Sequence, residues 1–289
     1  MHDLVLEPIQ PYSLLRSARG SNPTRQIRDG IVSLAFEVAG QPTLANVWQR
    51  PDGLLGVRTD REACAETLAH LKFVLATDVD HGPFLDRVAD DPVLGDLVSQ
   101  CRGLRPMRTS TVAHAVLQAV AGQLITSREA RVIEHRIVAM TSTQHAGLWL
   151  PPTCARLRAC SPAQLVRAGL ASRRAGALAR VVRTLDVERL RSVATDRVVA
   201  RIERESTLGP WSAGVVAIYG LGRYEHGLVG DLGLIRLCSN LLGRAATADD
   251  TQRLLARYGE WAGLACMHLM HHPLARRRTH GTGPRHLAA

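Results

Sequence analysis

The N-terminal part of the chain alternates short apolar segments with turn-forming residues. The segments 31–38, 44–49 and 54–58 are rich in apolar and β-branched side chains and have the length of strands. Residues 40–42 and 51–53 between them contain proline, which restricts φ, and glycine, which permits positive φ. This pattern predicts a small, β-rich N-terminal domain.

Beyond residue 61 the apolar positions change to helical spacing. Asp91 and Pro92 predict the start of a helix that carries Leu94 and Leu97 on one face, and residues 103–109 have the character of a linker. Ser161 before Pro162 predicts another helix start, because serine caps well and proline suits the first helical position. After the linker, helices are predicted over residues 110–122, 126–140, 172–185, 187–193, 195–205, 231–242 and 248–271, with one more starting at 210.

These elements predict a mainly α protein with a small α+β N-terminal domain. The N-terminal domain with its linker spans residues 1–108, and the helical domain spans residues 109–274. The basic segment 275–289 is expected to be a disordered tail.

The charge of the chain favours a polyanionic partner. Its formal net charge is +10, and among 36 lysine and arginine residues only Lys72 is a lysine. Such an excess favours nucleic acid, although arginine also serves as a general solubilising residue, so charge alone does not decide between the two. Any reaction that needs a lysine amine has a single candidate side chain.

Other features exclude a membrane protein and favour the cytoplasm. No apolar run reaches the roughly 18 residues of a membrane-spanning helix, and the first residues lack the features of a secretory signal. The six cysteines show no zinc or iron–sulfur spacing, so no metal site is predicted. Cys64, Cys238 and Cys266 are expected to be buried, and Cys154 with Cys160 offers a redox pair as an alternative to a reduced state.

A candidate binding site lies where two predicted helices meet. The turn at 206–209 joins them, Gly209 suits a tight backbone, and Pro210 suits a helix start. The amide groups at such a helix start can bind a phosphate oxygen, although many helix pairs have this form without any ligand. Asp231 follows Trp211 by twenty residues and begins another helix, where an aspartate also serves as a simple cap.

From about Tyr12 to about His271 the chain resembles the helix-hairpin-helix DNA glycosylases, and among them the bacterial 3-methyladenine DNA glycosylase II group. The hairpin TLGPWSA at 207–213, the carboxylate of Asp231 and their spacing match the family pattern. The segment AGQLI at 121–125 matches the family's Gly-Gln-apolar segment, and the stretch from DPVL at 91–94 to GLRP at 103–106 matches the end of the N-terminal domain with its linker.

The resemblance implies a helix-hairpin-helix glycosylase fold, with an antiparallel sheet in the N-terminal domain. It implies that Asp231 is the catalytic carboxylate, that Leu124 wedges into the duplex, and that Trp211 forms a wall of the base pocket. Val215 and Met270 fall where the family group has aromatic pocket residues. It further implies a monovalent cation at the hairpin carbonyls, no required cofactor, and a monomer that binds double-stranded DNA through Gln123, Leu124, Ser206, Thr207, Leu208, Gly209 and Ser212.

The expected activity is that of a monofunctional glycosylase in DNA repair, located in the bacterial cytoplasm with the nucleoid. Superfamily members that also cleave the strand use a lysine of the second hairpin helix, and the resemblance places Trp211 at that position. Water is therefore the expected nucleophile, and a 3-methyladenine-like alkylated purine the expected substrate.

Departures from the family pattern leave two alternatives open. Thr207 replaces the first hairpin glycine, Gly230 replaces an acidic residue before Asp231, and the pocket is less aromatic at Val215 and Met270. These departures allow a glycosylase for another damaged base. They also allow a DNA-binding module that recognises lesions without excising them.

Overall fold

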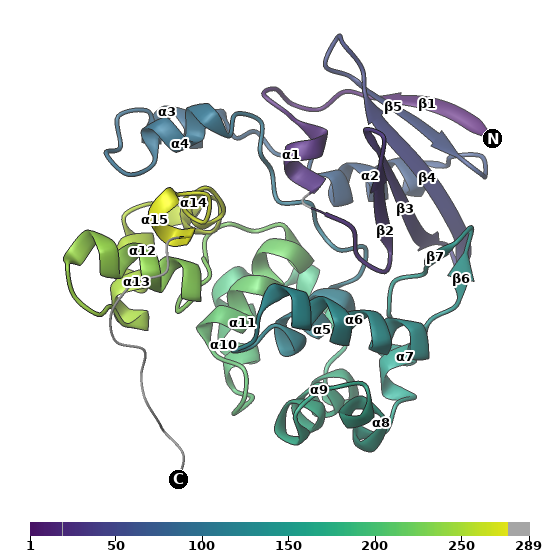
Figure 1. The fold of residues 1–289 in the computed structure, drawn as a ribbon. Coiled ribbons are helices and arrows are strands. Elements are labelled where there is room, and N and C mark those ends of the chain that lie inside the picture. The colour runs from purple at the N-terminus through teal and green to yellow at the C-terminus, as the bar shows by residue number, and fades with distance from the viewer. Residues whose placement is uncertain (19, 277–289) are drawn as a thin grey trace.

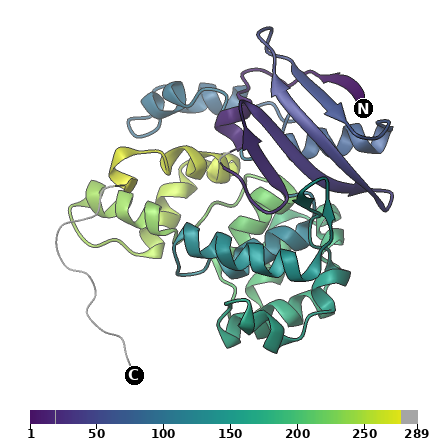
Figure 2. The ribbon, with the colours of Figure 1, turned by 45° about the vertical axis from the view of Figure 1, so that its right-hand side comes forward.

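A computed structural model describes residues 1–18 and 20–276. The N-terminal sheet lies on one side of the molecule, and the helices from α5 onward fill the other side (Figure 1). Helices α3 and α4 extend from the sheet over α14 and α15, which the turned view also shows (Figure 2). The chain therefore combines a predominantly helical body with a small antiparallel sheet, as the sequence predicts.

The N-terminal sheet has five antiparallel strands in the order β1-β5-β4-β3-β2. The three predicted strands are confirmed as the central β3 and β4 and their neighbour β5. The two edge strands are not predicted, because β1 is short and β2 holds a single apolar residue, Ile27. The strands are β1 (His2–Leu6), β2 (Arg25–Arg28), β3 (Ile31–Val38), β4 (Gln41–Gln49) and β5 (Leu55–Thr59), and a small separate pair is formed by β6 (Gln144–His145) and β7 (Leu148–Trp149).

The predicted helical region after residue 109 is confirmed in most of its elements. Capping boxes start the helices at Thr126 and Ser161, as expected for residues of this type. The predicted helix over 248–271 is wrong as one element, since it is divided near Gly259, which has a φ of +56°. The segment 187–193 is a 3-10 helix rather than an α-helix.

The helices that precede the linker are α1 (Leu14–Ala18), α2 (Ala65–Leu75), α3 (Gly82–Val88) and α4 (Gly95–Gln100). Those that follow it are α5 (Val112–Ala121), α6 (Ser127–Thr141), α7 (Cys154–Arg158), α8 (Pro162–Arg167), α9 (Ser172–Thr184), the 3-10 helix η1 (Val187–Ser192), α10 (Thr195–Glu203), α11 (Pro210–Val215), the π-helix η2 (Val216–Leu221), α12 (Leu232–Leu242), α13 (Ala248–Ala256), the 3-10 helix η3 (Gly259–Trp261), α14 (Ala262–Leu269) and α15 (Pro273–Arg276).

Two large hydrophobic clusters form the interior. The smaller one lies between the sheet and helices α1 and α2. The larger one fills the helical body and also takes side chains from α3 and α4, among them Phe84 and Leu94. These two helices thus pack with the helical body, although they precede the linker predicted at residue 103. The packing follows from their apolar faces, which have no strand of the sheet to cover.

Several smaller expectations can be compared with the structure. Cys238 and Cys266 are buried as predicted, whereas Cys64 is exposed at the start of α2, so its predicted burial is wrong. Residues 275 and 276 of the expected tail belong to α15, and its remainder, 277–289, lies outside the described residues. Within residues 1–18 and 20–276, no helix has the length and apolar character needed to cross a bilayer, and no group of His, Cys, Asp and Glu side chains is arranged to hold a metal.

Burial of a histidine predicts an acid-sensitive stability. His70 stacks on Phe36 with ring centroids 4.6 Å apart, and burial lowers its pKa to about 4, helped by the charge of Arg191. Its ordinary value of 6.5 applies in the unfolded chain, so the unfolded state binds a proton first as the pH falls. Stability is therefore expected to decrease from pH 6.5 towards pH 4, with a contribution from this residue of up to about 1.4 kcal/mol per pH unit.

Urea unfolding at a series of pH values measures this effect. The His70→Gln variant is expected to show a shallower decline below pH 6.5 than the wild type, and His135→Gln, at an exposed position of α6, is expected to keep the full decline. Equal slopes for the wild type and His70→Gln would contradict the assignment.

Candidate active site

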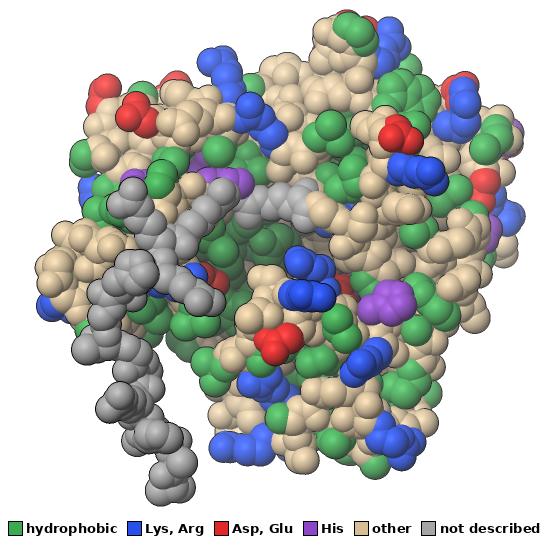
Figure 3. Space-filling view, viewed as in Figure 1, with side chains coloured by type: hydrophobic (Ala, Val, Ile, Leu, Met, Phe, Trp, Pro, Cys, Tyr) green, Lys and Arg blue, Asp and Glu red, His purple; other side chains and the backbone are tan. Residues whose placement is uncertain are grey.

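A cleft of about 1300 Å³ separates the two sides of the helical body and reaches the N-terminal sheet. Its walls come from the segment before β2, from α5, α6 and the loop between them, and from α11, α12 and α14. Figure 3 shows this face as a hollow with hydrophobic side chains on its floor and basic side chains at its rim. Trp211, Val215, Asp231 and Met270, which the sequence predicts as catalytic or pocket residues, all line this cleft.

Trp211 is held in the cleft from two directions. It follows Pro210 in the first turn of α11, and its indole Nε1 donates a hydrogen bond to Asp231 Oδ2 at 3.1 Å. The far edge of its ring lies over Gly122, where an added Cβ would come within 2.8 Å of Trp211 Cη2. The side chain is half-buried, so it is a wall of the cleft with one face against protein.

Asp231 is both a helix cap and a cleft residue. Its Oδ1 accepts a hydrogen bond from the amide of Gly233 at 2.7 Å, which caps α12. Gly230 before it has a φ of +81°, and its amide donates to Thr251 Oγ1 at 2.8 Å. Because Thr251 is buried in α13, this bond anchors the loop that presents the carboxylate.

Leu124 lies at the rim of the cleft with its apolar side chain in solvent. Its side chain is 86% exposed, and its φ is +55° although it is not a glycine. A residue of this kind in the left-handed region costs about 1–2 kcal/mol. The neighbouring Gln123 anchors the loop, because its Nε2 donates to the carbonyl of Thr207 at 2.6 Å and to Ser212 Oγ at 2.9 Å.

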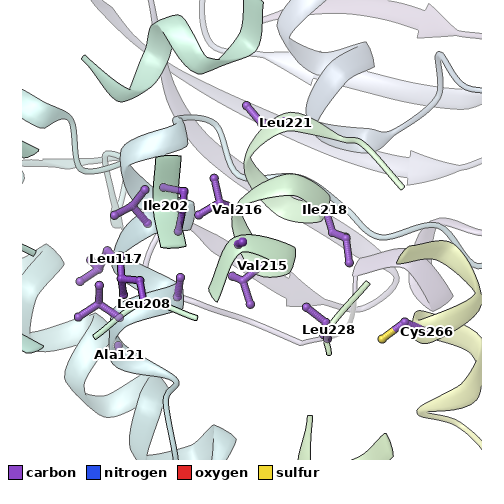
Figure 4. Close-up of a cluster of buried hydrophobic side chains, with 14 of the residues drawn as sticks. Leu117, Ala121, Ile202, Leu208, Val215, Val216, Ile218, Leu221, Leu228 and Cys266 are labelled. Atoms are coloured by element: carbon purple, nitrogen blue, oxygen red, sulfur yellow. The ribbon is translucent and has the colours of Figure 1, made fainter. Parts of the chain in front are cut away.

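The hairpin between α10 and α11 is fixed from beneath by the core. Leu208 is buried beside Leu117, Ala121 and Ile202 of the neighbouring helices (Figure 4). Its amide donates to the carbonyl of Glu205, so that amide is already in use and does not face a phosphate. The remaining predicted DNA contacts divide by exposure: Ser206 is exposed, Thr207 and Gly209 are half-buried, and Ser212 is buried beneath Gln123.

Comparisons with known proteins agree with this geometry. No family model matches the chain. Two curated proteins of Mycobacterium tuberculosis, each named a probable bifunctional transcriptional activator/DNA repair enzyme AlkA, are 26% identical to it over 261 residues. The match covers 86% of this chain and 52% of the relative, so the chain spans about half the length of the curated relatives it matches.

Solved structures show the same arrangement of elements. The 3-methyladenine DNA glycosylase from Archaeoglobus fulgidus superposes with a TM-score of 0.80 at 18% identity, covering 93% of this chain and 97% of that one. The 8-oxoguanine glycosylase/lyase of Clostridium acetobutylicum in its apo-form superposes with a TM-score of 0.77 at 14% identity, covering 93% and 96%. The chain has the helix-hairpin-helix DNA glycosylase fold. The predicted fold class and the resemblance to these glycosylases are thereby confirmed.

In this glycosylase fold, one face of the second hairpin helix lines the cleft. Trp211 and Val215 occupy it, and so does Tyr219, which is not predicted from the sequence. The hydroxyl of Tyr219 donates to the sulfur of Met267 at 3.4 Å. The spacing of Trp211, Val215 and Tyr219 by four residues is the signal that could have revealed the third, because such positions share a helix face.

The opposite wall carries a buried charged group that sequence patterns also do not reveal. Glu134 of α6 is 5% exposed, and its Oε1 lies 2.7 Å from His114 Nε2 and 2.9 Å from Gln118 Nε2. Burial acts to raise the pKa of Glu134, but the hydrogen bonds from His114 and Gln118 and the charges of His114 and Arg25 outweigh it and lower the pKa. Glu134 is therefore an ionised, buried carboxylate beside the cleft.

Proposed function

We propose that this chain is a monofunctional DNA glycosylase that removes an alkylated, 3-methyladenine-like purine from double-stranded DNA. The observation that carries the proposal is the hydrogen bond between Trp211 and Asp231 inside a cleft with an exposed apolar side chain, Leu124, at its rim. An aromatic face beside a carboxylate suits a flipped base and the sugar attached to it.

In the proposed reaction the damaged nucleotide leaves the duplex and its base enters the cleft. Leu124 fills the gap in the base stack, which offsets part of the cost of unstacking. The glycosidic bond from C1′ to the base nitrogen breaks, and the base takes the electron pair. Asp231 stabilises the positive charge that develops on the sugar, and the oxygen of a water molecule bonds to C1′.

An alkylated purine suits this cleft for two reasons. Such a base is already electron-poor and leaves readily, so the reaction needs little acid assistance. Its positive charge is attracted to an aromatic face, and Trp211 with Tyr219 supplies aromatic surface in the cleft. The apolar side chains of Val215 and Met270 complete this wall.

The absence of strand cleavage follows from the position of lysine. A lyase step needs an amine that attacks C1′, and Trp211 stands where the resemblance places that lysine. The single lysine, Lys72, belongs to α2 in the N-terminal part and does not line the cleft. No cofactor is needed for the hydrolysis. The monovalent cation at the hairpin carbonyls, the monomeric state and the cytoplasmic location stay predictions.

Single-turnover assays on methylated duplex DNA test the function. The wild type is expected to release methylated bases, and strand breaks are expected only after the DNA is heated in alkali. Breaks without alkali, or a covalent adduct trapped with borohydride, would contradict the monofunctional mechanism. Tight binding to the duplex without release of any base would favour the lesion-binding module instead.

The close approach of Trp211 to Gly122 yields a prediction on activity. Gly122 has an ordinary φ of −82°, so alanine fits its backbone, but the new Cβ would lie 2.8 Å from Trp211 Cη2 and 3.1 Å from the carbonyl of Gln118. Gly122→Ala is therefore expected to displace the indole from Asp231 and to slow base release roughly 10- to 100-fold.

The matched control is Gly176→Ala in α9, where the nearest atom is Arg180 Nη1 at 3.4 Å on a flexible side chain. This control is expected to release bases at the wild-type rate. Wild-type kinetics in Gly122→Ala would show that the position of Trp211 does not matter for the reaction.

A further inference from the structure

Two charged residues that the proposed mechanism does not use line the same cleft. Arg25 begins β2 in the N-terminal part of the chain, and Glu134 lies in α6 on the helical side. Both face the space opposite Trp211, which none of the proposed catalytic steps accounts for. The base pocket is therefore completed by a donor and an acceptor from two separate parts of the fold.

Each of these residues has one polar atom left over. Glu134 uses Oε1 for both His114 and Gln118, and no hydrogen bond within the described part of the chain reaches its Oε2. Arg25 donates from Nε to the carbonyl of Gly20 at 3.2 Å and from Nη1 to the sulfur of Met107 at 3.7 Å, and its Nη2 has no hydrogen-bond partner among residues 1–18 and 20–276.

The two side chains are not a simple structural ion pair. Among the described residues Arg25 has no carboxylate within 4.0 Å, whereas Arg156 and Glu37 elsewhere in the molecule form a bidentate pair at 2.6 and 2.9 Å. Burial lowers the pKa of Arg25, and the charge of Glu134 opposes that change, so the two groups sense each other across the cleft. A polar ligand between them would satisfy both.

We infer, on the basis of the proposed function, that Arg25 and Glu134 recognise the edge of a 6-oxopurine and so direct the enzyme to guanine-derived or hypoxanthine bases. A 6-oxopurine presents a carbonyl acceptor at position 6 and an N–H donor at position 1. The guanidinium of Arg25 matches the acceptor, and the free oxygen of Glu134 matches the donor. A 6-aminopurine presents the reverse pattern, with a donor facing Arg25 and a ring nitrogen acceptor facing Glu134.

The test uses one sample of methylated DNA, because it holds both 7-methylguanine and 3-methyladenine. The rate constants for release of the two bases are measured together by chromatography, so the fraction of active enzyme cancels in their ratio. Arg25→Met is expected to lower the ratio of 7-methylguanine to 3-methyladenine release by roughly 10- to 100-fold, the effect of losing a charged hydrogen bond. Glu134→Gln is expected to lower the same ratio.

Two further variants separate recognition from folding and from phosphate binding. Arg25→Lys keeps the charge and removes the planar donor pair, so it is expected to lower the ratio even if Arg25→Met folds poorly. Arg28→Met changes an arginine of the same strand whose side chain is 82% exposed, and it is expected to leave the ratio unchanged.

The possible results are distinct. A wild-type ratio in both Arg25 variants, with 3-methyladenine still released, would overturn this inference and leave the proposed function intact. An equal loss for both bases would do the same, because a phosphate contact or a folding defect has that effect. Wild-type release of 3-methyladenine without 7-methylguanine would also overturn it. Release of neither base by the wild type would remove the proposed function and this inference with it.

Discussion

Single-turnover release of methylated bases is expected to fall by about 100- to 1000-fold in the Asp231→Asn variant, the size of effect seen when a positioned electrostatic group is removed. The carboxylate lies in the cleft and is anchored by the amide of Gly233 and the indole of Trp211. Asparagine has the same shape but no charge, so it cannot stabilise the positive sugar.

Stability and DNA affinity are expected to survive this substitution. Asparagine caps a helix as well as aspartate does, so the free energy of unfolding should change by less than about 0.5 kcal/mol. Removal of a negative charge does not weaken binding to a polyanion. Duplex binding by fluorescence anisotropy and thermal unfolding measure both quantities.

Two controls isolate the charge of Asp231. Trp211→Phe removes the indole donor but keeps the carboxylate, so it tests whether loss of that hydrogen bond alone explains the result; a decrease of at most about 10-fold is expected, equivalent to one hydrogen bond. Asp249→Asn makes the same chemical change at an exposed position in the first turn of α13 and should have no effect on release. Unchanged base release in Asp231→Asn would show that the residue is only a cap.

The second large effect is expected at Leu124, where stability and activity should change in opposite directions. Leu124→Gly relieves a φ of +55° at an exposed position and is expected to stabilise the free protein by about 1 kcal/mol. The same variant lacks the side chain that fills the gap in the duplex. Since burial of a leucine contributes about 1.5–3 kcal/mol, base release should slow by roughly 10- to 100-fold.

Ala146→Gly is the matched control for this pair of effects. Ala146 has a φ of +48° in the turn between β6 and β7 and does not line the cleft. Glycine should stabilise it by a similar amount with no change in base release. Unfolding curves and single-turnover release measure the two effects, and the fluorescence of 2-aminopurine beside the lesion reports flipping directly. Normal flipping by Leu124→Gly would exclude the wedge.

Local patterns explain which elements are predictable from the sequence. The capped helix starts at Thr126, Ser161 and Asp231 depend on a few neighbouring residues, so they can be recognised without knowledge of the fold. The central strands are similarly clear, because both the strands and their turns carry local signals. The edge strands β1 and β2 are not, since their place depends on pairing with strands distant in sequence.

The sequence by itself determined the hairpin, the helix that begins at Asp231, and the resemblance that connects them with Leu124. Only the tertiary structure decided that Trp211 donates to Asp231, that Tyr219 joins the cleft, and that Leu208 turns inward. It also decided that Arg25 and Glu134 line one cavity, although 109 residues separate them. The physical reason is that capping and helix periodicity act over a few residues, whereas a cleft is formed by side chains whose proximity depends on the packing of the whole fold.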